Sequence, residues 1–239
     1  MESEHRTLVR RLSLACGVLF LITYVTSITA LALFQPVLDD PAGYIAGAGQ
    51  DGRIILGVVL ELALIAANIG TAVVLIPLFR RTRPVLSFGF LAARIVESTF
   101  IGAGILFVLG IVSLRSDDAG AASMAVSLAA LKDWTFLLGP GITVGIGNGL
   151  ILGYLLYRSG LVPRRMALLG IIGGPVLVAS GIAVLFGAVE AGGVVQSVAT
   201  APEFVWELFL GVYLTVRGLR MSPGAGDAEG AVAGMQPAM

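Results

Sequence analysis

The sequence predicts an all-α membrane protein, a polytopic bundle of six transmembrane helices with both termini in the cytoplasm. Of its 239 residues, 57% are hydrophobic and only 13% are charged, and the mean hydropathy is +0.96. Soluble domains carry about 25% charged residues, so this chain has roughly half the usual charge. Its apolar residues gather into six runs, each close to the roughly 20 residues that a helix needs to cross the hydrocarbon core.

The first three runs are well separated in the sequence. They are Leu12–Phe34, Ile54–Phe79 and Leu86–Leu114. A basic start before an apolar run is also typical of a signal peptide, and Ala30-Leu31-Ala32 resembles a cleavage site. The first run is longer than a signal sequence requires, so we expect an uncleaved helix. An acidic loop, residues 35–53, connects it to the second run.

The last three runs fill the second half of the chain. They are Trp134–Tyr157, Met166–Val189 and Pro202–Leu219. Before them, residues 117–132 are rich in alanine and serine, with apolar residues at helical spacing. This pattern predicts a short helix on the membrane surface. After them, residues 221–239 are rich in glycine, alanine and proline, which predicts a disordered tail.

The basic residues predict the orientation of the bundle, because cytoplasmic loops carry an excess of Lys and Arg. One side of the six-helix arrangement holds Arg6, Arg10, Arg11, Arg80, Arg81, Arg83, Arg158, Arg164, Arg165, Arg217 and Arg220, and the other holds only Arg53, Arg115 and Lys132. We expect the richer side to be cytoplasmic. Cytoplasmic tails (1–11 and 221–239) then flank a membrane domain (12–220).

Polar side chains inside the predicted helices are expected to meet in one cluster. They are Arg94, Glu97, Glu61, Glu207, Asn68 and Asn148. Arg94 and Glu97 are three residues apart and share one helix face. A charge near the centre of a membrane helix costs ~2.5–3.5 kcal/mol by insertion scales, so it persists only where it faces protein or water. The approximate depths of these residues are compatible with a single polar core.

The predicted cluster is unbalanced in charge. Arg94 is the only positive charge against Glu61, Glu97 and Glu207, and arginine stays protonated. Two carboxyl groups must therefore be neutral, or be compensated by a cation or by a water-filled cavity. One interpretation is a solute site or a proton relay, and this is favoured because ionisable groups in membrane helices are commonly functional. The other is a structural network that fixes how the helices pack.

Two further acidic residues have local explanations as helix caps. Thr200 and Glu203 have the spacing of a capping box, in which a threonine and a glutamate satisfy free N–H groups at a helix start. Asp133 directly precedes the fourth predicted helix and is expected to be its N-cap.

Small residues and prolines mark helix packing. Gly141, Gly145, Gly149 and Gly153 form a ridge with four-residue spacing, which allows another helix to approach closely, within the chain or in an oligomer. We favour packing within the chain. Gly139-Pro140-Gly141 and Gly173-Gly174-Pro175 should each kink or break a helix. Broken helices often line transporter sites, although ordinary kinks explain the same pattern.

The sequence contains no recognisable catalytic or metal-binding motif. Cys16 is the only cysteine and His5 is the only histidine, and His5 lies in the N-terminal tail. There is no HExxH, Walker A, GxSxG or dinucleotide-binding pattern. The formal net charge of zero gives no reason to expect nucleic-acid binding. We therefore expect neither enzymatic activity nor a cofactor or metal.

Several stretches resemble a bacterial family of six-span membrane proteins known as domain of unknown function forty-three eighty-six. These stretches are Leu38-Asp39-Asp40-Pro41-Ala42-Gly43-Tyr44, Ile76-Pro77-Leu78-Phe79-Arg80-Arg81, Ala93-Arg94-Ile95-Val96-Glu97, Leu156-Tyr157-Arg158-Ser159-Gly160-Leu161-Val162-Pro163-Arg164 and Ala201-Pro202-Glu203-Phe204-Val205-Trp206-Glu207-Leu208. The resemblance extends from Arg10 to Arg220. It implies an integral membrane protein and no established activity.

Together these observations favour a multi-pass protein of the cytoplasmic membrane whose buried polar cluster binds or moves a small solute or protons. The alternative, from a different class, is a membrane module that transports nothing and acts through protein partners. An intramembrane enzyme is disfavoured because no nucleophile and base are paired in the sequence.

Overall fold

The computed structural model describes residues 2–47, 49–116 and 120–220, and these residues form helices with no β-strand among them. Their bounds are α1 (Glu2–Asp39), α2 (Pro41–Ile45), α3 (Asp51–Phe79), α4 (Pro84–Ser113), η1 (Leu114–Ser116), α5 (Ala121–Phe136), η2 (Leu137–Thr143), η3 (Gly145–Leu152), α6 (Gly153–Ser159), α7 (Arg164–Leu185) and α8 (Val194–Val216). The all-α prediction is confirmed for this part of the chain. Residues 2–11, expected to be a tail, are the first turns of α1, and the predicted disordered tail lies outside the described residues.

Five helical segments in the described part of the chain are long and apolar enough to cross a membrane. They are Arg6–Asp39, Asp51–Phe79, Pro84–Ser113, Ala121–Ser159 and Arg164–Leu185. These segments support a multi-pass membrane protein. Although α8 has 23 residues, one more than α7, it is not among them, since Glu203 and Glu207 lower its hydropathy. A sixth crossing and the cytoplasmic placement of the termini stay predictions.

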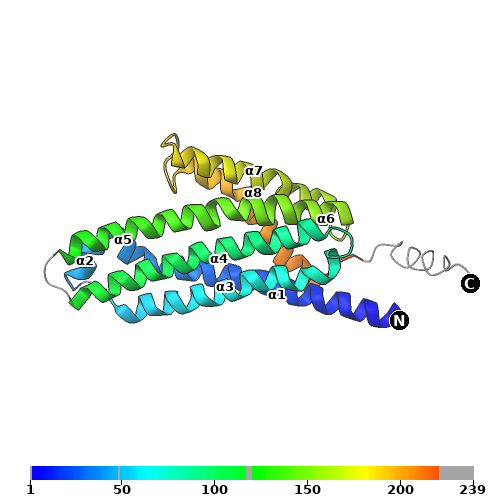
Figure 1. Cartoon of the computed structure of the whole chain (residues 1–239), viewed down its shortest axis with the longest axis horizontal. Coiled ribbons are helices and arrows are strands. Elements are labelled where there is room, and N and C mark those ends of the chain that lie inside the picture. Colours follow the sequence, from blue (N-terminus) through cyan, green and yellow to red (C-terminus); the bar gives the residue numbers. More distant parts are fainter. Residues whose placement is uncertain (1, 48, 117–119, 221–239) are drawn as a thin grey trace, which may run out of the picture.

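The long helices lie roughly side by side, and the N-terminal part of α1 and the end of α8 lie at the same end of the bundle (Figure 1). At that end of the bundle, the backbone N–H of Leu219 donates to Ser13 Oγ at 3.0 Å, and the N–H of Arg220 donates to the carbonyl of Leu161 at 2.8 Å. At the opposite end, where α2 and the start of α5 lie, the α7–α8 pair leans away from the other helices (Figure 1).

Two hydrophobic clusters fill the bundle, with a polar layer between them. The first includes Phe20 on α1 and Ala72 on α3, and the second includes Ala30 on α1 and Val58 on α3. Buried polar side chains lie between these positions along both helices. The apolar clusters therefore enclose the polar layer from both ends, which isolates it from the loops.

The fourth long helix begins earlier than the sequence suggested. The chain is helical from Ala121 to Ser159, so residues 121–132 are the first turns of this helix and not a separate surface helix. Ala125 and Ala129 are buried where α5 packs on α4, while Met124 is 56% exposed. Small residues, rather than the larger apolar ones, form the buried face because they let the two helices approach closely.

Each proline-containing stretch was expected to kink or break its helix, and neither breaks it. Around Pro140 the chain does not break but widens into π-helix over Leu137–Thr143, where the Thr143 hydroxyl donates to the carbonyl of Leu138 at 2.7 Å. A π-bulge accommodates proline because it relaxes the usual hydrogen-bond ladder. Around Pro175, α7 continues without interruption.

Three of the four glycines of the predicted ridge, Gly145, Gly149 and Gly153, pack inside the chain against α7. A methyl group added at Gly149 would lie 2.5 Å from the Cα of Gly174, and one at Gly174 would lie 2.3 Å from the carbonyl oxygen of Gly145. A methyl at Gly153 would lie 3.1 Å from the backbone nitrogen of Ile171. Packing within the chain is thus confirmed for these glycines, while oligomerisation stays untested.

Arg53 compensates for a proline inside α1. Pro36 has no N–H to donate to the carbonyl of Ala32, four residues earlier. Arg53, at the start of α3, donates to that carbonyl from Nη2 at 2.8 Å and to the carbonyl of Leu33 from Nε at 3.2 Å. This contact joins α1 to α3 where the helix ladder is interrupted.

Tyr44 connects the short helix α2 to its neighbours. Its side chain is buried, and its hydroxyl donates to Asp51 Oδ1 at 2.5 Å. Arg115 also contacts this oxygen, and its guanidinium lies 4.5 Å from the centre of the Tyr44 ring. Burial, followed by the hydrogen bond to the Asp51 carboxylate, raises the pKa of Tyr44 to about 12.

Candidate functional site

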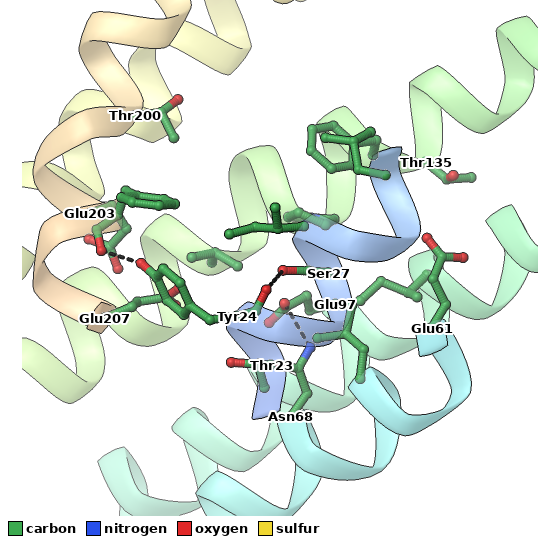
Figure 2. A pocket seen from close by; sticks show the side chains of 18 of the residues that line it. Thr23, Tyr24, Ser27, Glu61, Asn68, Glu97, Thr135, Thr200, Glu203 and Glu207 are labelled. Atoms are coloured by element: carbon green, nitrogen blue, oxygen red, sulfur yellow. Dashed lines mark hydrogen bonds between the residues drawn. The ribbon is translucent and has the colours of Figure 1, made fainter. Parts of the chain in front are cut away.

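A cavity of about 260 Å³ lies in the polar layer, and residues from each of the long helices line it (Figure 2). Its acidic and basic side chains belong to four glutamates, one arginine and one lysine. They are Glu61, Glu97, Glu203, Glu207, Arg94 and Lys132. Figure 2 shows Glu203 and Glu207 on the α8 side, with Glu61 on the opposite side. The remaining lining is largely apolar, so these groups are the main source of polarity.

Arg94 and Glu97 form the predicted ion pair on α4. Arg94 Nη1 lies 2.6 Å from Glu97 Oε2, and both side chains are buried. Asn68 Nδ2 donates to Glu97 Oε1 at 2.9 Å, and Arg94 Nε donates to Thr71 Oγ1 at 3.3 Å. Both oxygens of Glu97 therefore have partners. A pair with this many hydrogen bonds is stable in an apolar surrounding, because its buried polar atoms are satisfied.

A second ion pair, between Lys132 and Glu61, was missed in the sequence. Lys132 was assigned to the outer boundary, but it is only 5% exposed and its Nζ lies 2.6 Å from Glu61 Oε1. Arg94 is therefore not the only buried cation. Gly104 makes room for this lysine, because a methyl there would lie 2.9 Å from both Cδ and Nζ. The signal was the helical spacing of the small residues Ala121, Ala125 and Ala129, since Lys132 follows Ala129 by three residues and so shares their helix face.

Both buried cations also face aromatic rings. The guanidinium carbon of Arg94 lies 5.6 Å from the ring centre of Phe20 and 5.9 Å from that of Phe90. Lys132 Nζ lies 5.0 Å from the ring centre of Phe34. The negative ring faces attract the cations, which adds to the stabilisation from their carboxylate partners.

Glu203 and Glu207 differ from the other two glutamates because neither forms an ion pair with a described residue. Glu203 is only 2% exposed, yet neither of its carboxyl oxygens has a hydrogen-bond partner in the described part of the chain. Glu207 lies one turn further along α8, and its Oε1 also lacks a partner there. Both residues line the cavity. A buried carboxyl group without partners is energetically costly, so this arrangement requires an explanation.

The predicted capping roles are wrong for three residues. Because α8 begins at Val194, Thr200 and Glu203 lie in its interior, and the Thr200 hydroxyl donates to the carbonyl of Gln196 at 2.8 Å. Glu203 therefore belongs to the cavity. Asp133 lies inside α5, whose N-cap position is Gly120. The local patterns matched caps, but both helices extend further upstream.

Asn148 does not join the other predicted site residues. It is fully buried in the π-helical segment η3, and its side-chain amide has no partner in the described part of the chain. It does not line the cavity. Its backbone carbonyl accepts a hydrogen bond from Trp206 Nε1 at 3.0 Å, which connects η3 to α8. The cavity thus gathers Arg94, Glu97, Glu61, Glu207 and Asn68 from the predicted set.

The charges of the cavity do not cancel if all its groups are ionised. Two of the four carboxylates are paired with the two cations, one to one, which leaves Glu203 and Glu207. An isolated carboxylate in an apolar surrounding is so unfavourable that it takes up a proton or acquires a positive partner. The arrangement can therefore accept protons or a cation.

Comparison with known proteins identifies a family whose description assigns no activity. The family described as Domain of unknown function (DUF4386) matches residues 15–218, from within α1 to just beyond α8. The resemblance noted in the sequence is thereby confirmed. No curated protein and no solved structure matches the chain.

Proposed function

Because the chain belongs to this family, whose description assigns no activity, we propose a function from the cavity itself. The protein binds a small positively charged solute, or protons, inside the membrane, with Glu203 and Glu207 as the receiving groups. One observation carries this proposal: Glu203 is buried to 2% exposure, borders the cavity and has no partner for either carboxyl oxygen among the described residues.

The two ion pairs support the proposal by separating structural from receptive carboxylates. Glu97 and Glu61 each have a cation at 2.6 Å, so they are already compensated and contribute to helix packing. Glu203 and Glu207 have no such partner, and a bound cation or proton would supply it. Binding at this pair then requires no rearrangement of the two existing ion pairs.

Proton movement is tested with purified protein in liposomes that contain a pH-sensitive dye. Under an imposed membrane potential, we expect wild type to acidify the interior faster than protein-free liposomes. Glu203→Gln and Glu207→Gln should each remove this difference, since glutamine keeps size and hydrogen bonding but cannot carry a charge. The matched control is Glu190→Gln, which changes an exposed glutamate between α7 and α8 and should behave as wild type.

Background-level acidification by folded wild type would refute proton movement and leave the cationic solute to be tested by binding. If folded wild type binds no cation either, the cavity is a structural network. The alternative class, a membrane module that acts through protein partners, would then be favoured.

A further inference from the structure

We propose that the cavity binds an amphiphilic organic monocation, such as an ammonium with an apolar body, and that this ligand reaches it sideways from the bilayer. This inference rests on the proposed function and specifies its ligand. It combines the charge of the cavity with the character of its walls and the position of its mouth.

The donor set favours an organic cation over a metal ion. No group of three or more His, Cys, Asp or Glu side chains in the described residues is arranged to hold a metal. Ca²⁺ takes about 6–8 oxygen ligands, whereas the unpaired acids here are only Glu203 and Glu207. The nearby hydroxyls of Tyr24 and Ser27 donate their protons to the backbone carbonyls of Phe204 and Tyr24, so they do not satisfy the two acids. Two carboxylates in an apolar cavity suit an ammonium group, which needs few ligands.

The walls of the cavity supply a place for an apolar body. Aliphatic and aromatic side chains line it alongside the acids, among them Phe34, Leu64, Ile101 and Leu177. Its volume of about 260 Å³ is below the ~300–1,000 Å³ of sites for drug-sized ligands, so the ligand is small. A small hydrated ion would leave these apolar walls in contact with water.

The mouth of the cavity faces the lipid side of the bundle. Ile28 and Leu31 on α1, Phe136 on α5 and Phe204 on α8 all line the cavity. They are also exposed on the outside of the bundle, by 52%, 43%, 50% and 44% respectively. Apolar side chains that are both lining and exposed mark an opening between α1, α5 and α8, at the end where the α7–α8 pair leans away (Figure 1).

Two aromatic rings line the cavity together with the unpaired acids, and one of them belongs to Phe204 at the mouth. The rings of Tyr24 and Phe204 are 4.9 Å apart between centres and tilted by 58°. Figure 2 shows the Tyr24 ring beside Glu203 and Glu207. Aromatic faces attract ammonium groups, particularly quaternary ones. A ligand that enters here would contact aromatic faces as well as the carboxylates.

The test measures equilibrium binding of tritiated benzyltrimethylammonium to the protein in lipid nanodiscs. Wild type and the exposed-residue control Glu190→Gln should bind it. The double variant Glu203→Gln/Glu207→Gln should bind it roughly tenfold or more weakly, because contacts to a charged group are lost. The neutral carbon analogue, neopentylbenzene, should not compete, and tetramethylammonium should compete only at much higher concentration.

These comparisons separate the ligand class from the proposed function. Equal competition by tetramethylammonium would overturn the amphiphilic ligand but leave cation binding intact. Competition by the neutral analogue at equal concentration, or no binding of either cation by folded wild type, would overturn cation recognition as well. The competition measurements use wild type alone, so they test the class of ligand even if the double variant does not fold.

The lateral route has its own kinetic test. Leu31→Trp enlarges a side chain at the mouth and should slow association several-fold while changing the equilibrium affinity much less. The matched control is Leu56→Trp on α3, where the residue is 52% exposed but does not line the cavity. Equal association rates for both variants would overturn access through this mouth.

Discussion

The buried ion pair between Lys132 and Glu61 allows a sharp test of the packing around the cavity. Lys132→Met keeps an unbranched side chain of similar length but removes the cation. Since Glu61 Oε2 has no partner among the described residues and Lys132 Nζ is 2.6 Å from Oε1, the substitution leaves the carboxylate without its only observed partner. We expect a large loss of stability from this single change.

The magnitude follows from the burial of the pair. Removing one partner of a buried ion pair costs ~3–5 kcal/mol, and Lys132 is only 5% exposed. We expect about 3 kcal/mol, because Glu61 can take up a proton and limit the loss. At ~2–4 °C per kcal/mol for a chain of this size, the melting temperature should fall by roughly 6–12 °C.

The assay is a double-mutant cycle with Glu61→Gln, measured by thermal unfolding in one detergent. Replacing both partners by neutral residues of similar size is often nearly neutral, so Lys132→Met/Glu61→Gln should recover most of the loss. The coupling between the two substitutions should then be about 2 kcal/mol. Losses that simply add, or a Lys132→Met protein as stable as wild type, would refute the pairing.

Three further outcomes follow from contacts elsewhere in the fold. Gly104→Ala should lower stability by ~1–3 kcal/mol in thermal unfolding, since its methyl would overlap the buried Lys132. The control, Gly102→Ala on the same helix, should be tolerated because its methyl meets no atom closer than 3.9 Å. Arg53→Ala should lower the free energy of unfolding by about 1 kcal/mol, because its hydrogen bonds to α1 are lost. The loss should be smaller in a Pro36→Ala background, which restores one helix N–H. An equal loss in both backgrounds would contradict the role of Arg53. Because the pKa of Tyr44 is raised to about 12, above the ~10 of an unfolded tyrosine, its stabilising contribution is complete below pH ~10 and is lost as the pH rises toward 12. The melting temperature of Tyr44→Phe should therefore fall less steeply over that pH range than that of wild type. Identical pH profiles for the two proteins would contradict the stabilising role of the Tyr44 hydroxyl.

The sequence predicted the interior of the fold better than its helix ends. Long apolar runs report directly on membrane helices, so five of them correspond to segments that are long and apolar enough to span. Arg94 and Glu97 were paired correctly because both lie on one helix, three residues apart. Contacts of this kind depend only on helical periodicity, which the sequence contains.

Interactions between helices were less predictable. Glu203 has the local pattern of a cap, and only the upstream extension of α8 to Val194 places it inside the helix. Lys132 was placed on the outer side, at the end of the predicted surface helix, but its partner Glu61 lies on α3. Which residues meet across two helices depends on helix rotation and separation. Those quantities are set by packing of the whole bundle and not by any local pattern.

The π-helical segments have a geometric consequence for the glycine ridge. An α-helix turns 100° per residue, so positions four apart advance by about 40° and a ridge with that spacing gradually winds around the helix. The wider π-helical turns of η2 and η3 contain more than four residues each, so positions four apart drift in the opposite direction there, which offsets the drift of the α-helical turns. Gly145, Gly149 and Gly153 can therefore keep facing α7 over their length.

Because that face stays aligned, α7 lies along the ridge at close range, and α8 packs on α7. The same alignment places Gly149 beneath the unpaired carboxyl group of Glu203, where a methyl would lie 2.8 Å from Oε2. The π-helical turns of η2 and η3 thus help to set the position of the Glu203 carboxyl group, which α8 carries.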